Sequence, residues 1–246
     1  MIVKERIDYI TNWIATYAKK SSEKTFSLII GISGGIDSAV TSTLCAKTHL
    51  RTIVVSLPIR QNSQQFDLSL EHIEWLKLNN DNVENHTINL DTVFSSFYEK
   101  MSNFKSELGF ANSRSRIRML TLYQIAQFSN GLVVGTGNKV EDFGIGFYTK
   151  YGDGGVDISP IADCTKSQIW DMGKALGISE KIINAKPTDG LWDDSRNDEE
   201  QIGLTYEQIE EAMENNKSKF YNKYNKIRKS NLHKMNPIPV CKIKEN

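Results

Sequence analysis

The sequence has few cysteines, no excess of charge and no long apolar run. Its 246 residues include only Cys45, Cys164 and Cys241, which lie far apart and form no CxxC motif. An odd number of scattered cysteines in a chain of this size excludes a disulfide framework. No stretch of about 18 apolar residues is present, so the sequence predicts no membrane-spanning helix.

Charges of the two signs balance, with 30 Lys and Arg residues against 30 Asp and Glu residues. Proteins whose main partner is nucleic acid usually carry a basic surplus, so we expect no such partner. The four histidines do not pair at metal-ligand spacing. The charged N-terminus does not resemble a signal peptide, which predicts a cytoplasmic location. Length and composition are typical of one globular domain, and we predict that it spans residues 1–246.

Short apolar runs alternate with amphipathic segments over the first 135 residues. The apolar runs predict strands at 25–32, 52–57, 83–90 and 132–135. The amphipathic segments predict helices at 3–17, 37–47, 67–78 and 112–128. In the last of these we expect Ile117, Leu120, Ile125 and Phe128 to point inward. This alternation predicts an α/β fold with a mostly parallel sheet and helices on both faces.

The second half is more polar. A Gly-rich loop at 144–160 precedes a predicted helix at 166–176, closed by Gly177 as its C-cap. A polar loop at 186–198 and helices at 205–215 and 217–229 follow. Residues 189–214 hold ten acidic residues and one basic residue, whereas 217–244 hold nine basic and no acidic residues. Either two solvated helical faces pair with each other, or the basic tail closes over an anionic ligand.

The loop between the first predicted strand and the next helix is suited to phosphate. Glycines let the backbone approach an anion, and the first turn of a helix presents free N–H groups and a partial positive charge. The loop matches neither the Walker pattern nor GxGxxG. We predict that it binds ATP through Gly31, Ile32, Ser33, Gly34, Gly35, Ile36, Asp37 and Ser38.

Asp37 is the informative residue in this loop. A carboxylate beside a phosphate repels it unless a cation lies between them, and Mg²⁺ binds one or two carboxylates together with phosphate oxygens. The alternative is an ordinary turn in which Asp37 caps the helix.

The string Ser33-Gly34-Gly35-Ile36-Asp37-Ser38 resembles the pyrophosphate loop of the N-type ATP pyrophosphatases. A second region, Val134-Gly135-Thr136-Gly137-Asn138-Lys139-Val140-Glu141 followed by the stretch from Gly146 to Pro160, is similar to NAD synthetase, as are Lys186-Pro187-Thr188 and His233-Lys234. The resemblance covers nearly the whole chain. It implies an adenine-nucleotide α-hydrolase-like fold.

The resemblance also implies a reaction. NAD synthetases use ATP and Mg²⁺ to adenylate the carboxylate of nicotinic acid adenine dinucleotide, and ammonia then displaces AMP to give NAD. The sequence leaves no segment for a glutamine-hydrolysing domain, so free ammonia is the expected nitrogen source. The resemblance further implies a homodimer with the substrate site formed across the interface.

The family's functional residues map onto named positions in this chain. Asp37 and Glu141 match metal ligands, and Lys166 completes the expected catalytic set. Further ATP contacts are expected from Arg60, Thr136, Lys166 and Thr188. Dinucleotide contacts are expected from Arg116, Lys150, Asp157, His233 and Lys234. Compared with the usual spacing in the family, the chain carries one extra residue between Glu141 and Lys150. The resemblance therefore leaves either Glu141, which we favour, or Asp142 as the metal ligand.

Three arginines, Arg114, Arg116 and Arg118, fall near the start of the helix predicted at 112–128. Cations there oppose the helix dipole, so they favour an anionic partner, or else they neutralise acidic neighbours.

Two other functions fit parts of the sequence. Another N-type pyrophosphatase would adenylate a purine nucleotide or a tRNA base, which the basic C-terminal block favours. An ATP-binding sensor would bind the nucleotide and release no pyrophosphate, and the paired carboxylates argue against it.

Overall fold

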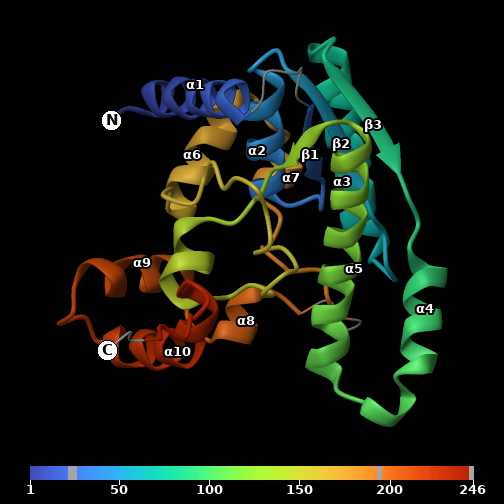
Figure 1. Ribbon diagram of the computed structural model, residues 1–246. Coiled ribbons are helices and arrows are strands. Elements are labelled where there is room, and N and C mark those ends of the chain that lie inside the picture. Colours follow the sequence, from blue (N-terminus) through green and yellow to red (C-terminus); the bar gives the residue numbers. More distant parts are fainter. Residues whose placement is uncertain (22–26, 193–195, 244–246) are drawn as a thin grey trace.

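A four-stranded parallel sheet forms the centre of the computed structural model, which describes residues 1–21, 27–192 and 196–243 (Figure 1). The strands are β1 (Ser27–Gly31), β2 (Arg51–Ser56), β3 (Val83–Thr87) and β4 (Gly131–Val133), in the order β3-β2-β1-β4. Every neighbouring pair is parallel. The predicted α/β class and parallel sheet are confirmed. Thr25 and Phe26, in the first predicted strand, lie outside the described residues.

Helices cover both faces of this sheet because alternate strand residues point to opposite sides. Leu28 and Ile30 of β1 face one apolar cluster, and Ile29 faces another. On the first face lie α1 (Val3–Ser21), α2 (Ile36–Ala46), α3 (Ser63–Asn79), α6 (Lys166–Leu176) and α7 (Glu180–Ile183). On the second lie α4 (Asp91–Lys100) and α5 (Glu107–Phe128), with the 3₁₀ turn η1 (Ser102–Phe104) between them.

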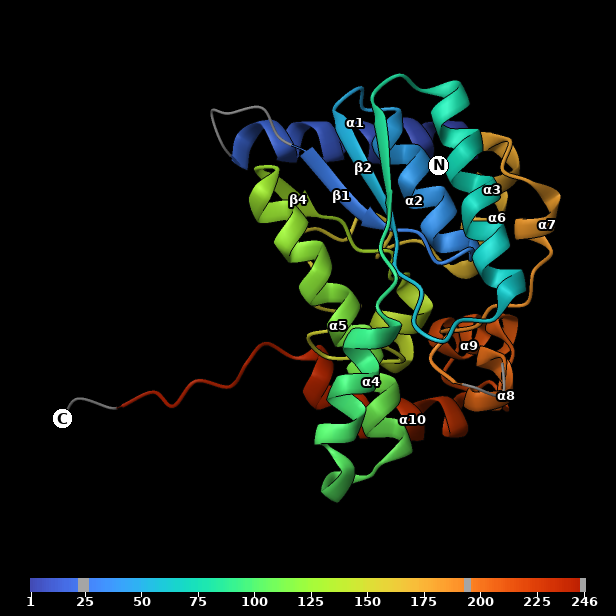
Figure 2. The same ribbon diagram turned by 90° about the vertical axis from the view of Figure 1, so that its right-hand side faces the viewer.

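A third apolar cluster gathers the C-terminal elements beside the sheet (Figure 1). It contains the π-helical segment η2 (Lys139–Ile145), α8 (Asp198–Ile202), α9 (Tyr206–Glu214) and α10 (Tyr221–Met235). Beyond α10 the described chain runs outward as an extended tail (Figure 2).

Several boundaries differ from the sequence-based expectation. The structure places the start of α3 four residues earlier than predicted, at Ser63, because Asn62 supplies the N-terminal cap by accepting a hydrogen bond from Gln64 N. The helix α4 was not predicted at all. The helix α6 and its left-handed cap at Gly177 (φ 75°) are confirmed.

The prediction for α5 was wrong in two respects. Leu120 and Phe128 are 70% and 86% exposed, whereas Leu122 and Ala126 pack on the core. The helix begins at Glu107, so the three arginines lie in its middle rather than in its first turn. A helix dipole acts within the terminal turns, and the dipole argument for an anionic partner therefore fails.

Across the described residues, no helix is long and apolar enough to cross a membrane. Within the same residues, no ion pair joins the acidic block 189–214 to the basic block 217–244. The helices α9 and α10, which carry parts of the two blocks, share the third apolar cluster.

Two leucines of α3 test the placement of this helix. Leu76 is fully buried and Leu78 is 84% exposed. Leu76→Ala should lower the free energy of unfolding by about 2–5 kcal/mol, because it removes buried methyl groups and leaves a cavity. The matched Leu78→Ala should change it by no more than about 0.5 kcal/mol. Urea denaturation measures both, and equal effects would contradict the orientation of α3.

Candidate active site

The loop between β1 and α2 forms a strained turn held by serines. Gly34 has φ +88°, and a Cβ there would collide with the backbone oxygen of Gln65. Ser38 Oγ accepts a hydrogen bond from Ser33 N (3.2 Å) and donates to Gly35 O (2.9 Å). Glycine is therefore required at position 34, and the hydrogen bonds of Ser38 hold the loop in its shape.

The first turn of α2 opens from this loop without a side-chain cap. Gly35 is the N-cap residue and, having no side chain, offers no capping oxygen. The N–H groups at such a helix start bind anions well. This end of α2 borders a cleft at the carboxyl ends of the strands, where parallel sheets usually bind ligands.

The cleft has a volume of about 1280 Å³. A site for one small ligand usually measures roughly 300–1,000 Å³, so this cleft is larger than one small ligand needs. It brings together nearly all the residues predicted to act at the site. The predicted residues that line it are those of the loop at 31–38 and Arg60, Arg116, Thr136, Glu141, Lys150, Lys166, Thr188, His233 and Lys234.

Asp157 is the exception, because it does not line the cleft. Its carboxylate accepts hydrogen bonds from Val133 N (2.8 Å) and Tyr123 Oη (3.1 Å), at the junction of β4 and α5. Within one chain, Asp157 therefore stabilises the end of β4 by a hydrogen bond to its backbone.

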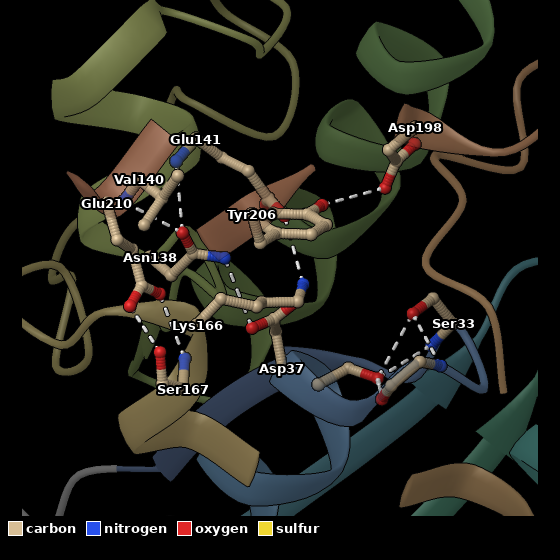
Figure 3. A network of polar contacts seen from close by, with 12 residues as sticks. Ser33, Asp37, Asn138, Val140, Glu141, Lys166, Ser167, Asp198, Tyr206 and Glu210 are labelled. Atoms are coloured by element: carbon tan, nitrogen blue, oxygen red, sulfur yellow. Dashed lines mark hydrogen bonds and ion pairs between the residues drawn. The ribbon is translucent and has the colours of Figure 1, made fainter. Parts of the chain in front are cut away.

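A buried ammonium group lies at the centre of the site (Figure 3). The side chain of Lys166, the first residue of α6, is 2% exposed, and its Nζ lies 2.6 Å from Asp37 Oδ2 and 2.9 Å from Glu141 Oε1. This ion-paired triad joins the start of α2, the segment η2 and the start of α6. The three residues predicted to be catalytic are thus in direct contact.

The triad alters the acid–base properties of its members. Burial acts to lower the pKa of Lys166, but the charges of Asp37 and Glu141 outweigh it and raise that pKa. At Glu141 burial acts to raise the pKa, and Lys166 together with a hydrogen bond from Tyr206 lowers it below its ordinary value. At Asp37 burial prevails over the charge of Lys166, and the pKa is raised.

Three further residues belong to the network, and two of them, Tyr206 and Asp198, carry no signal in the sequence pattern. Asn138 caps η2 by accepting from Val140 N and Glu141 N, both at 3.0 Å, and it donates to Asp37 Oδ1 (3.3 Å). Tyr206 Oη donates to Glu141 Oε1 (2.6 Å) and lies 3.2 Å from Asp198 Oδ2. Only the tertiary fold brings these side chains to the triad.

The helix α10 holds the far end of η2. Arg228 donates to the carbonyl groups of Phe143 and Gly144, and Asn231 donates to Ile145 O at 2.9 Å. Lys234 Nζ donates to Tyr148 O (2.8 Å). The carbonyl groups left unpaired at the end of η2 are thereby satisfied, so α10 fixes the segment that carries Glu141.

Two more carboxylates line the cleft, Asp142 and Asp153. Burial and the neighbouring acidic groups raise the pKa of Asp142 well above its ordinary value. Its carboxylate lies over Gly137, where an added Cβ would collide with it. Asp153 Oδ1 accepts a hydrogen bond from Ser115 Oγ at 2.6 Å.

Three other residues predicted to contact ATP or the dinucleotide are held by interactions within the chain. Arg60 stacks its guanidinium over Phe94, 5.3 Å from the ring centre, and its backbone N donates to Asp91. Arg116 Nε donates to Lys150 O (3.2 Å), and Thr188 Oγ1 donates to Arg196 O (3.1 Å).

The oxygen atoms available in the cleft suit Mg²⁺ better than a metal ion that is bound by protein side chains alone. Among the described residues no three His, Cys, Asp or Glu side chains converge to hold a metal. Asp37 and Glu141 instead form a pair of hard oxygen ligands beside an anion-binding helix start. Mg²⁺ is usually held by one or two carboxylates, with phosphate oxygens and water completing its shell.

A parallel sheet, an uncapped helix start and a buried lysine between two carboxylates define a nucleotide-dependent α/β enzyme. The NAD synthase family model matches residues 6–243. The chain belongs to this family, whose members form a C–N bond as ligases, so the resemblance and the enzyme class predicted from the sequence are confirmed.

Individual relatives and solved structures are similar to this chain over nearly its whole length. The NH₃-dependent NAD⁺ synthetase of Mesoplasma florum is 35% identical over 242 residues, which cover 96% of each chain. Among solved structures, the NMN synthetase of Francisella tularensis has a TM-score of 0.91 and 31% identity, with 99% of this chain and 100% of that chain covered. The NH₃-dependent NAD synthetase of Campylobacter jejuni has a TM-score of 0.79 at 24% identity and covers 98% and 100%.

Removal of the buried cation tests the triad. Lys166→Met should lower the free energy of unfolding at pH 7 by about 3–5 kcal/mol, because it leaves the partly buried carboxylates of Asp37 and Glu141 without their shared cation. Lys174→Met, at an exposed position of the same helix, is the control and should change little. Chemical denaturation at several pH values provides the measurement.

The pH dependence follows from the signs of the shifts. Glu141 has a lowered pKa in the folded state, so its stabilisation is present above its unfolded pKa and is lost as pH falls through the folded pKa. Lys166 has a raised pKa, so its contribution persists until the pH rises through that folded value. The cost of Lys166→Met should therefore be smaller near pH 4 than at pH 7, and a pH-independent cost would contradict the ion-paired triad.

Proposed function

We propose that this protein converts nicotinic acid adenine dinucleotide to NAD, using ATP and ammonia. The observation that carries the proposal is the Asp37–Lys166–Glu141 triad beside the phosphate-binding start of α2. The family match and the names of its relatives support the reaction class. Pyrophosphate and AMP are the expected by-products.

The reaction begins with a poor electrophile, because a carboxylate resists attack by ammonia. A carboxylate oxygen of the substrate bonds to the α-phosphorus of ATP, and the bond from that phosphorus to the pyrophosphate oxygen breaks. Ammonia then attacks the acyl carbon, loses a proton and displaces AMP. In this scheme the N–H groups at the start of α2, with Ser33 and Ser38, bind the phosphates, and Lys166 fixes the geometry of the two carboxylates.

Asp37 and Glu141 are the residues that would hold Mg²⁺. When bound with ATP, the ion would neutralise phosphate charge and favour departure of pyrophosphate. Glu141 rather than Asp142 is the second ligand in this proposal, because Glu141 contacts Lys166 and is linked by it to Asp37, whereas the carboxylate of Asp142 lies over Gly137.

We also propose a homodimer. Large apolar side chains of α5 are exposed along its outer face, including Leu120 and Phe128. Tyr123, which binds Asp157, belongs to the same helix. A second copy packed there would bring Asp157 towards the partner's substrate, as the sequence resemblance implies. A cytoplasmic location and a single NAD synthetase domain over residues 1–246 also remain predictions.

A second candidate substrate is nicotinic acid mononucleotide. The structural match with a TM-score of 0.91 is to an NMN synthetase, and this is a stronger likeness than that to the Campylobacter jejuni NAD synthetase. Amidation of the mononucleotide is the same chemistry on a substrate that lacks the adenylate half.

A paired assay should decide between the two substrates. The purified protein is incubated with ATP, Mg²⁺ and ammonium, and with either the dinucleotide or the mononucleotide, and the amide product is measured together with pyrophosphate. We expect kcat/KM to be higher for the dinucleotide. A higher value for the mononucleotide would replace the first proposal by the second, and pyrophosphate release with neither amide would contradict both.

Three single substitutions test the assignment of the metal ligands. Asp37→Asn and Glu141→Gln should each lower kcat by roughly 100-fold or more and raise the Mg²⁺ concentration needed for half-maximal rate. Asp142→Asn, which makes the same change next to Glu141, should leave the Mg²⁺ requirement within about threefold. A Mg²⁺ titration at saturating ATP gives the answer. If Asp142→Asn raises the requirement more than Glu141→Gln does, Asp142 is the ligand.

A further inference from the structure

We propose that Tyr206 is a positioning residue for the adenylation site: its hydroxyl, backed by Asp198, fixes the Glu141 carboxylate in the orientation in which it faces Asp37 across Lys166. This inference rests on the function proposed above. It adds a residue of α9, an element that supplies none of the predicted site residues.

The contact between Tyr206 and Glu141 is short, and its tyrosine side is buried. Tyr206 Oη lies 2.6 Å from Glu141 Oε1, and the tyrosine is 1% exposed (Figure 3). Lys166 Nζ binds the same oxygen at 2.9 Å and lies 4.8 Å from the centre of the tyrosine ring. Two donors on one oxygen fix the rotation of the carboxylate, and neither of these two bonds uses the second oxygen, Oε2.

Asp198 determines which way the hydroxyl proton points. A tyrosine hydroxyl carries one proton, yet Tyr206 Oη has carboxylate oxygens at 2.6 Å on Glu141 and 3.2 Å on Asp198. The shorter contact takes the proton, so the longer one is a hydrogen bond only if Asp198 donates it. Burial and then the charge of Glu141 raise the pKa of Asp198 to about 8, which favours the protonated carboxyl at neutral pH.

The backbone around Tyr206 is held equally firmly. Tyr206 N donates to Glu199 Oε1 (3.1 Å), and Thr205 caps α9 in a capping box with Gln208. Ser167, next to Lys166, is bound to Glu210 of the same helix. The helix α9 thus holds both Glu141 and the start of α6, although Tyr206 itself does not line the cleft.

Tyr206→Phe removes one hydroxyl and keeps the ring. A hydrogen bond to a charged group contributes about 1.5–3 kcal/mol, which corresponds to a change of roughly 10- to 150-fold. We therefore expect kcat to fall by at least about tenfold while KM for the nicotinate substrate stays within twofold. The affinity for Mn²⁺ in the presence of an ATP analogue with a methylene-bridged α,β-phosphate, measured by electron paramagnetic resonance, should fall in parallel.

The matched control is Tyr224→Phe. Tyr224 is a tyrosine of the same apolar cluster, 7% exposed, on α10. It should leave kcat and Mn²⁺ affinity unchanged. If Tyr206→Phe leaves both unchanged too, or if it loses activity only through a lower melting temperature with Mn²⁺ affinity intact, the positioning role is wrong.

Substitutions at Asp198 provide a second test of the positioning role of Tyr206, and this test decides on that role if Tyr206→Phe fails to fold. Asp198→Asn keeps an N–H donor opposite the hydroxyl and should retain most of the Mn²⁺ affinity and kcat. Asp198→Ala should change both in the same direction as Tyr206→Phe, and equal behaviour of the two Asp198 variants would overturn the proposal. The Mn²⁺ measurement needs no turnover, so it tests Tyr206 even if neither nicotinate substrate reacts.

Discussion

The buried ammonium group of Lys166 is the constraint on which the site depends. A charge removed from water costs several kcal/mol unless opposite charges and hydrogen bonds replace the lost hydration. Here Asp37 and Glu141 provide that replacement, at 2.6 and 2.9 Å. Asp37 lies more than a hundred positions before Glu141 and Lys166 in the sequence. Because both carboxylates must reach the same ammonium group, this one cation fixes the relative positions of α2, η2 and α6. The adenylation site proposed above is built at the point where they meet.

The same constraint leaves several carboxylates around a single buried lysine, although arginine and lysine side chains line other parts of the cleft. One buried lysine faces the carboxylates of Asp37 and Glu141, and Asp142 and Asp153 lie nearby. Burial, and after it the repulsion between these carboxylates, raises the pKa of Asp142. ATP would bring further negative charge, so the proposed reaction requires both the N–H groups of α2 and a cation that enters with the nucleotide.

Sequence patterns located the parts of the site that depend on local chemistry. Ser33-Gly34-Gly35 and Asp37 follow a buried strand directly, and the positive φ of Gly34 explains why glycine is needed there. The patterns failed where tertiary packing decides. Leu120 has the spacing of a core residue but is exposed, because the helix presents Leu122 to the sheet instead. Tyr206 follows an ordinary helix cap, and nothing in its neighbourhood indicates a contact with a residue 65 positions earlier.

The π-helical segment η2 (Lys139–Ile145) carries Glu141 into the site. π-helical turns are rare and occur mostly as short irregularities, often at functional sites. Such a turn is poorly stable alone, and here Asn138 closes one end while Arg228 and Asn231 bind the carbonyl groups at the other. Glu141 therefore keeps its place opposite Asp37 because elements at both ends of the segment hold it there, and α10 has a structural role in the site beyond the contribution of His233 and Lys234 to the cleft wall.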